Sequence, residues 1–357
     1  NRRHLLQRAG CGFGMLGLAA MLQQQGLLEQ ACASDLSEDR SLNPLAPREG
    51  HFPAKAKHVI WIFVNGGPSH VDTWNYRPEL TKWNGKSIRE FDSEFKNTTG
   101  FFKNSVGKLM QSPFNFTPQG ESGKMVPEIF PHLGKHVDKM AFLLSGHTDS
   151  NNHSPALFAM NTGMPRMGFP CVGAWATYGL GSESSNLPGF VVMSDPQGRG
   201  LPKGHAANWS AGFLPGVYQG TYLRPNGQPI DNLVRPEKMG DSGQRRQLDL
   251  IKQLNQTHLE KNFSDGELAA RIESFELAFR MQTAAPEALD IASEPKHVQE
   301  LYGVGNEQCD HFAKQCLMSR RLIERGVRFV QIYSGGMENQ RSWDGHNDIE
   351  GNHRQFA

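Results

Sequence analysis

Three short stretches of the chain gather histidine, aspartate, asparagine and serine, the side chains that bind metal ions and transfer protons. These stretches span residues 65–74, 147–155 and 334–353. Each follows an apolar run that has the composition of a buried strand. The candidate residues are Asn65, Ser69, Asp72, His147, Asn152, His153, Ser154, Asp344, His346 and His353.

The third stretch carries the clearest set of metal ligands. Asp344 and His346 are two residues apart, and His353 follows within the same segment. Mixed carboxylate and imidazole ligands suit zinc, manganese or iron(II) more than calcium. We therefore expect a divalent ion, zinc or manganese before calcium, held by Asp344, His346 and His353 together with Asp72. The alternative interpretation is a solvated loop.

The second stretch precedes a predicted helix at 154–161. A helix N-terminus offers free N–H groups and the positive end of a dipole, which suit a phosphate or sulfate ester. His147 and Asn152 are candidate substrate-binding residues, and His153 is a candidate catalytic residue. The two histidines could ligate a metal or act as acid and base. Alternatively, Ser154 caps the helix and the histidines are surface residues.

The first stretch contains Asn65, two glycines and Pro68 before Ser69. The glycines allow the backbone to approach a ligand closely, so Asn65 and Ser69 are candidate substrate-binding residues. Ser69 or Asp72 could instead cap a helix whose first turn contains Pro68. The two interpretations are compatible with each other.

The elements that must position these residues alternate along the chain. Strands are predicted at 58–64, 139–145, 189–194 and 326–333, each buried on both faces. Helices are predicted at 126–136, 154–161, 241–282 and 306–325. The region 241–282 is expected to hold one or two long helices, with a break in the helical structure at Pro286. This order predicts an α/β fold, a three-layer sandwich with a mostly parallel central sheet. Sites in such folds lie at the carboxyl ends of the strands, so the three stretches should converge.

The N-terminal segment has the composition of an export signal. Arg2 and Arg3 precede a Gly-rich apolar run of 9–22, which is short for a transmembrane helix, and small residues follow. We interpret 1–33 as a twin-arginine-type signal, and so expect a periplasmic or otherwise exported protein that engages the twin-arginine export machinery and has no stable membrane anchor. The alternative is an amphipathic helix. Residues 34–57 are a predicted linker, and 58–357 the folded domain.

Composition excludes some classes of protein. The chain of 357 residues has 37 Lys and Arg against 36 Asp and Glu, a net charge of +1. A nucleic-acid partner is therefore not expected, because phosphate binding needs a basic surplus. Outside the signal, Cys171, Cys309 and Cys316 have no spacing typical of a disulfide framework or a thiolate zinc site. The Gly- and Pro-rich span 196–238 is interpreted as an excursion that caps the substrate side.

Taken together, the stretches HVIWIFVNGGPSHVDTW, SGHTDSNNHSPALFAMNTG and VRFVQIYSGG…WDGHNDIEGNH, with the twin-arginine start, resemble a known family. The chain is similar to the sulfatase-like domain-of-unknown-function family 1501, within the alkaline phosphatase/sulfatase superfamily. The resemblance covers nearly the whole body of the chain. It implies an alkaline phosphatase/sulfatase-like fold.

The chain departs from true sulfatases at several positions. Their paired aspartates after the first strand are replaced by Asn65 and the more distant Asp72, and their catalytic cysteine and arginine are absent. By resemblance, Ser154 is the nearest candidate nucleophile. The phosphatase and phosphomutase branches use a later Asp-His pair, and none follows before Ala357. We therefore expect the domain to lack its C-terminal part in this chain.

Three hypotheses for function follow. The leading one is an exported, metal-dependent hydrolase-like protein that acts on sulfate or phosphate esters, either small molecules or polysaccharides. A metal at Asp344 and His346 would polarise the ester and lower the pKa of a water or of Ser154. The alternatives are a non-catalytic envelope binding or scaffold protein that keeps the fold, and a phosphomutase or phosphodiesterase.

Overall fold

The computed structural model describes residues 43–93, 107–150, 152–195, 197, 199–224, 229–230, 233, 240–261, 266–337 and 339–357. The predicted export signal and the first part of the predicted linker lie outside these residues. Within the remainder of that linker, Leu45 is buried against the core, and Arg48 donates hydrogen bonds to the carbonyls of Pro44 and Tyr178.

A four-stranded parallel sheet forms the centre of the protein, with the order β1-β6-β4-β5. The strands are β1 (Val59–Val64), β6 (Phe329–Ser334), β4 (Phe190–Met193) and β5 (Thr221–Leu223). All residues of β4 and β6 are buried, as their continuous apolar runs predict. The expectation of an α/β fold with a parallel sheet is confirmed.

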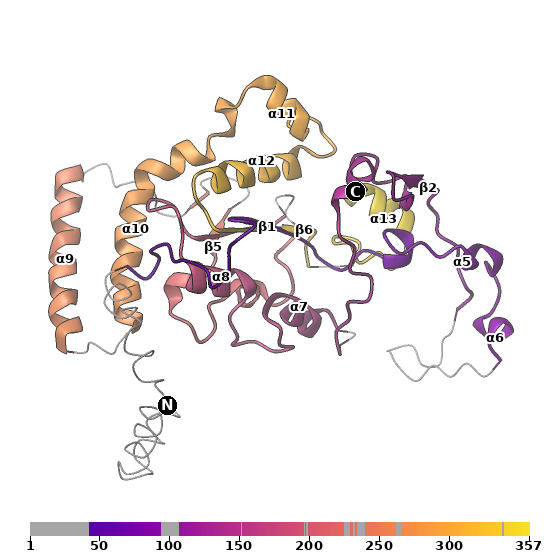
Figure 1. The fold of residues 1–357 in the computed structure, drawn as a ribbon, viewed down its shortest axis with the longest axis horizontal. Helices are drawn as coiled ribbons and strands as arrows, with labels where there is room; N and C mark the ends of the chain where they lie inside the picture. Colours follow the sequence, from indigo (N-terminus) through magenta and orange to yellow (C-terminus); the bar gives the residue numbers. More distant parts are fainter. Residues whose placement is uncertain are drawn as a thin grey trace, which may run out of the picture.

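Helices cover both faces of this sheet (Figure 1). On one face lie α7 (His153–Thr162) and α8 (Val172–Leu180); on the other lie α10 (Gly266–Leu289) and α12 (Asp310–Glu324). One apolar core packs the sheet against α10 and α12, and a second packs it against α8 and the 209–218 segment. The sheet thus lies between helical layers, and loops cover the edge at which its parallel strands end.

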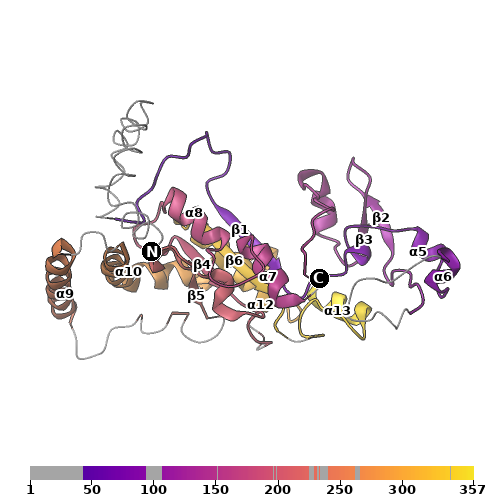
Figure 2. The same cartoon turned by 90° about the horizontal axis from the view of Figure 1, so that it is seen from below.

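The predicted 241–282 helical region consists of two helices, α9 (Asp241–Lys261) and α10, which pack against each other at one end of the molecule (Figures 1 and 2). The predicted break at Pro286 is wrong, because α10 continues to Leu289. Ala285 and Ala288 are buried on either side of this proline. Core packing of the last turn therefore outweighs the one backbone hydrogen bond that proline cannot donate.

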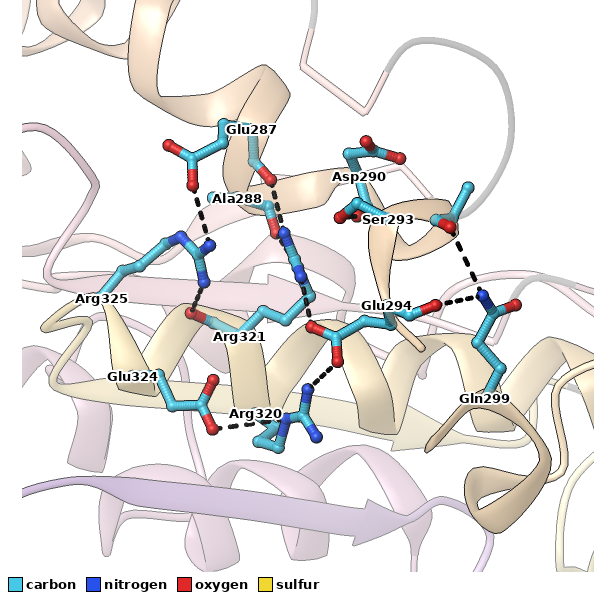
Figure 3. Close-up of polar contacts among 11 residues, drawn as sticks. Glu287, Ala288, Asp290, Ser293, Glu294, Gln299, Arg320, Arg321, Glu324 and Arg325 are labelled. Carbon is cyan, nitrogen blue, oxygen red and sulfur yellow. Dashed lines mark hydrogen bonds and ion pairs between the residues drawn. The ribbon is translucent and has the colours of Figure 1, made fainter. Parts of the chain in front are cut away.

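An ion-pair cluster joins the end of α10 to α12 (Figure 3). Glu294 accepts hydrogen bonds from the guanidinium groups of Arg320 and Arg321. Arg321 also donates to the backbone carbonyls of Glu287 and Ala288. These bonds satisfy carbonyls that the helix end leaves free, so the cluster fixes the connection between the two helices.

A hairpin replaces the short helix predicted at 126–136. Strands β2 (Phe116–Gln119) and β3 (Lys124–Pro127) pair antiparallel, and a 3-10 helix follows at Leu133–Lys139. Val126 and Val137 belong to a third apolar core, together with Trp343. The apolar pattern of this segment therefore serves hairpin packing rather than a helix face.

The strand predicted at 139–145 is also absent. Phe142 packs against Trp74 of the hairpin core, with its ring centroid 5.3 Å from that of Trp74. Leu143 is 91% exposed and Leu144 is also exposed. Phe142 therefore attaches this apolar run to the third apolar core, and the run does not pair with the central sheet.

Strand β1 exists as predicted, but the prediction that it is buried on both faces is wrong. Its only partner in the described sheet is β6, so it is an edge strand, and Val59, Ile60 and Ile62 are exposed. The span 196–238, predicted to be irregular, contributes β5 and two 3-10 helices, η3 (His205–Trp209) and η4 (Gly216–Tyr218). The remaining described elements are η1 (His70–Asp72), α5 (Glu79–Lys82), α6 (Ile88–Phe91), η5 (Ile291–Ser293), α11 (Lys296–Tyr302) and α13 (Ile349–Phe356).

None of the helices formed by the described residues combines the length and apolar character that crossing a membrane requires.

Candidate metal centre

Three predicted site residues meet beyond the C-terminal edge of the sheet. His153 Nε2 lies 2.9 Å from Asp344 Oδ2, and His346 Nε2 lies 2.8 Å from Asp344 Oδ1. One ligand atom from each of the three residues lies within 4.8 Å of the others. Two imidazoles around one carboxylate are a ligand set that suits zinc and related ions.

Helix α7 places His153 at its first position. The side chain of Asn152 caps the helix by accepting a hydrogen bond from the Ser154 N–H at 3.2 Å. Pro155 lies in the first turn, where its missing N–H costs nothing, and Gly163 ends the helix with a φ of 78°. The predicted helix is confirmed, and Asn152 serves as its cap.

A buried polar network ties α7 to the sheet. Asn161 Oδ1 accepts a hydrogen bond from Gln331 Nε2 of β6 at 2.9 Å, and Gln331 Nε2 also contacts the Tyr333 hydroxyl at 2.6 Å. All three residues are buried. These hydrogen bonds connect the helix that carries His153 to the strand that leads to Asp344, although Gln331 Oε1 has no partner among the described residues.

The loop that carries Asp344 packs closely on the turn after β1. A Cβ atom at Gly66 would lie 2.6 Å from the Asp344 nitrogen and 2.5 Å from Ser342 Oγ, so only glycine fits there. Trp343 N donates to the Asn65 carbonyl at 2.8 Å. The predicted convergence therefore holds for the turn after β1, the start of α7 and the loop after β6.

Asn65 adds an unsatisfied oxygen at this point. Asn65 is 2% exposed, and its side-chain amide nitrogen donates to the Gly336 carbonyl. Its Oδ1 has no hydrogen-bond partner among the described residues, although Asn65 lines one small pocket with His153 and Asp344. A buried acceptor without a partner is costly, and a bound cation or donor would satisfy it. The residues present therefore fit a divalent ion.

Lys203 lines the same pocket and brings a positive charge to it. Its ammonium group makes no hydrogen bond or ion pair with any residue that the structure describes. The backbone around it is fixed, because Asn208 Nδ2 donates to the Lys203 carbonyl at 2.8 Å. Asn161 Nδ2 in turn contacts Asn208 Oδ1 at 3.4 Å, which links this loop to α7.

Ser69, Asp72 and His353 form a separate group. Ser69 donates through its hydroxyl to Asp72 Oδ2 and through its N–H to His353 Nε2, the latter at 2.9 Å. His353 Nδ1 contacts Asn352 Oδ1 at 3.1 Å, so both ring nitrogens already have protein partners. Burial lowers the pKa of His353, against a smaller opposing effect of Asp72. This neutral, fully bonded imidazole anchors α13 to the turn after β1.

His147 and Ser154 stand apart from the centre. His147 is exposed and makes no hydrogen bond or ion pair within the described part of the chain. Ser154 is half-buried in the first turn of α7, and no hydrogen bond of its hydroxyl to another described residue occurs. Of the ten predicted site residues, His153, Asp344 and His346 form the cluster, and Asn65 lines the pocket beside it.

Sequence reasoning missed Asp195, Arg199 and Lys203. Asp195 lies two residues after the end of β4, and a polar residue after a strand is the same signal that singled out the other three stretches. Arg199 and Lys203 lie in the aperiodic 196–238 span, where no local pattern indicates that they return to the sheet edge. Only the tertiary structure reveals their position.

The fold and the cluster define an α/β protein whose candidate metal centre lies at the carboxyl edge of a parallel sheet. The chain matches the family described as "Protein of unknown function (DUF1501)" over residues 56–357, and it belongs to that family. No curated protein and no solved structure shows a significant match.

Proposed function

We propose that the protein is an exported, metal-dependent hydrolase of sulfate or phosphate esters. The observation that carries the proposal is the cluster of His153, Asp344 and His346, whose ligand atoms lie within 4.8 Å of one another. The pocket beside it offers the unsatisfied Asn65 oxygen and the Lys203 ammonium group. These groups are complementary to a cation and to an anionic ester, respectively.

His153, Asp344 and His346 would hold the divalent ion, with Asn65 as an additional oxygen ligand. When bound, such an ion supplies Lewis acidity toward an ester oxygen. Lys203 would bind the anionic group of the substrate, and the N-terminus of α7 would add the positive end of the helix dipole. Ser154 is the proposed nucleophile, because it lies in the same helical turn as His153.

The test uses the purified full-length chain after removal of metal and reloading with zinc or manganese. Metal content and turnover of a phosphomonoester, a phosphodiester and a sulfate ester are measured for wild type, Asp344→Ala and the remote control Asp249→Ala. We expect metal binding and turnover of at least one ester by wild type and the control, and loss of both in Asp344→Ala. Preference for a diester, or phosphoryl transfer to a sugar, would assign the protein to the phosphodiesterase or phosphomutase class.

One feature favours a second candidate, a binding protein that keeps the fold. A serine nucleophile needs a base within hydrogen-bond reach, and the Ser154 hydroxyl has none among the described residues. Metal-dependent binding of an anionic polysaccharide, with no turnover of any ester, would identify this function. Substitution of Ser154 by alanine would then leave binding unchanged.

We also propose that residues 1–33 direct export through the twin-arginine machinery, as their composition predicts. The segment is fused to a reporter that is active only after export of the folded protein. Conversion of Arg2 and Arg3 to lysine should abolish reporter export, whereas an equally exported double variant would contradict the proposal.

A further inference from the structure

Asp195 lies two residues after the end of β4, at the edge of the sheet where the candidate metal centre is found. Asp195 Oδ2 accepts hydrogen bonds from Arg199 Nη1 and from Gly335 N, both at 3.0 Å. Asp195 is 5% exposed and Arg199 is 8% exposed. Since desolvation of two charges offsets much of their attraction, a buried pair of this kind is weak evidence for a role in stability alone.

The backbone of Arg199 holds the same turn from a second side. Met337 N donates to the Arg199 carbonyl at 3.1 Å, and a Cβ atom at Gly336 would lie 1.9 Å from that carbonyl oxygen. The Arg199 guanidinium also lies 4.5 Å from the ring centroid of Phe356 in α13. The pair therefore contacts the beginning of the loop after β6 and the helix that follows its end.

The turn at 334–337 is also connected to Asp344, one of the candidate metal ligands. Gly336 N donates to the Arg341 carbonyl at 2.8 Å, and the Gly336 carbonyl accepts from the Asn65 side chain. The backbone of Gly335 is packed so closely on Ser342 that a Cβ atom would lie 2.9 Å from its Cα. A displacement of this turn would therefore move Ser342 and, two residues further on, Asp344, whose N–H donates to Ser342 Oγ at 3.4 Å.

We propose that Asp195 and Arg199 are positioning residues that hold Asp344 in register with His153 and His346. This inference rests on the proposed metal centre, and neither residue is required to touch the ion or the substrate. Partners hydrogen-bonded directly to a ligand change metal affinity by about 10- to 100-fold, and Asp195 and Arg199 act one step further away, through the turn at 334–337.

The test compares Asp195→Asn, Asp195→Ala, Arg199→Met and Arg199→Lys with Glu294→Gln, which weakens the remote ion pair of Figure 3. Co²⁺ affinity, the visible Co²⁺ spectrum and the melting temperature are measured for each full-length variant. We expect about a 10-fold loss of affinity and an altered spectrum for Asp195→Asn, a larger loss for Asp195→Ala, and partial rescue by Arg199→Lys relative to Arg199→Met. Glu294→Gln should lower the melting temperature and leave both Co²⁺ readouts unchanged.

A second readout needs no metal. In the metal-free protein, the imidazole NMR signals of His153 and His346 report their contact with Asp344 and should shift in Asp195→Asn but not in Glu294→Gln. If wild type binds no Co²⁺, the proposed function fails and these signals still decide the positioning role. If Asp195→Asn does not fold, Arg199→Met and its partial rescue by Arg199→Lys carry the same comparison. Asp195 or Arg199 variants that lose thermal stability but keep wild-type Co²⁺ and imidazole signals would overturn the inference.

Discussion

Two clusters of ionisable side chains in this protein differ in the bonding partners of their charged groups. In the cluster around Glu294, two guanidinium groups surround one carboxylate, and the remaining Arg321 donors reach helix-end carbonyls (Figure 3). In the cluster around Asp344, two imidazoles surround one carboxylate beside a pocket that also holds an unsatisfied oxygen and a lysine. The charges of the first cluster pair with one another, although Arg320 Nε has no hydrogen-bond partner among the described residues, whereas the second cluster lies beside a pocket with room for a ligand.

The difference lies in residue type as well as in geometry. Arginine remains charged at all accessible pH values and presents a planar set of donors, so it saturates a carboxylate. Histidine offers a nitrogen lone pair when neutral, and therefore competes poorly for carboxylates but ligates metals well. A similar number of side chains thus fixes a helix connection in one region and forms a candidate metal centre in the other.

The largest expected effect that separates the two clusters is that of Asp344→Ala. Removal of the carboxylate that both imidazoles contact should weaken zinc affinity by more than about 100-fold, since loss of an outer-shell partner alone costs about 10- to 100-fold. Titration of zinc into the metal-free protein measures this effect. Wild-type affinity in the variant would place the metal elsewhere.

A smaller loss is expected for Asn65→Ala. The unsatisfied Oδ1 is lost together with the hydrogen bond to Gly336, so zinc affinity should fall about 10-fold. The exposed amide of Asn115 provides a control, because Asn115→Ala removes only a contact with Glu128 of the hairpin. Equal affinities for the two variants would show that the Asn65 oxygen does not face the ion.

Lys203→Met should weaken binding of the anionic substrate rather than of the metal. A charge-assisted hydrogen bond contributes about 1.5–3 kcal/mol, so KM or the inhibition constant of inorganic phosphate should rise about 10-fold or more. Lys203→Arg should retain part of the affinity, and Lys296→Met, at an exposed site on α11, should have no effect. If Lys203→Met changed zinc affinity and left KM unchanged, Lys203 would act on the metal site and not on the substrate.

The smallest effect on the metal centre is expected from Glu294→Gln, which should lower the melting temperature by several degrees and leave zinc affinity unchanged. Hydrogen bonds from Arg320, and then from Arg321, hold the pKa of Glu294 below its usual 4.5. A carboxylate with a lowered folded-state pKa stabilises the protein above its unfolded pKa, and this contribution is lost as pH falls through the folded pKa.

The advantage of wild type over Glu294→Gln should therefore be full at pH 6 and diminish below about pH 4.5. Melting curves across this range measure it. An advantage that grows on acidification would show that the ion pair does not act through the ionised carboxylate.

The sequence predicted the parts of the fold that a local pattern encodes. The continuous apolar runs of β4 and β6 identify buried strands, and Gly163 marks the end of α7. The cap of α7 is Asn152 and not the predicted Ser154. The apolar run at 139–145 has the same local character but no strand partner, because Phe142 packs against Trp74 instead. Pairing partners and layer membership depend on distant residues, so composition alone could not separate these cases.

The candidate site shows the same division. Asp344 and His346 are predicted as site residues because they lie in the loop after β6, where parallel topology makes side chains converge. The strand predicted before His153 is absent, and His153 reaches them from the start of α7. His353 and Asp72 have suitable residue types, yet their hydrogen bonds fix the contact between α13 and the turn after β1. Lys203 reaches the pocket only through the tertiary path of an aperiodic segment.

The central claim is that His153, Asp344 and His346 hold one divalent ion. The most direct measurement is anomalous X-ray scattering at the zinc edge from a crystal of the zinc-loaded full-length protein. The account predicts one strong anomalous peak within bonding distance of the three ligand atoms. Absence of a peak there, or a peak at another group of residues such as Asp72, would contradict it.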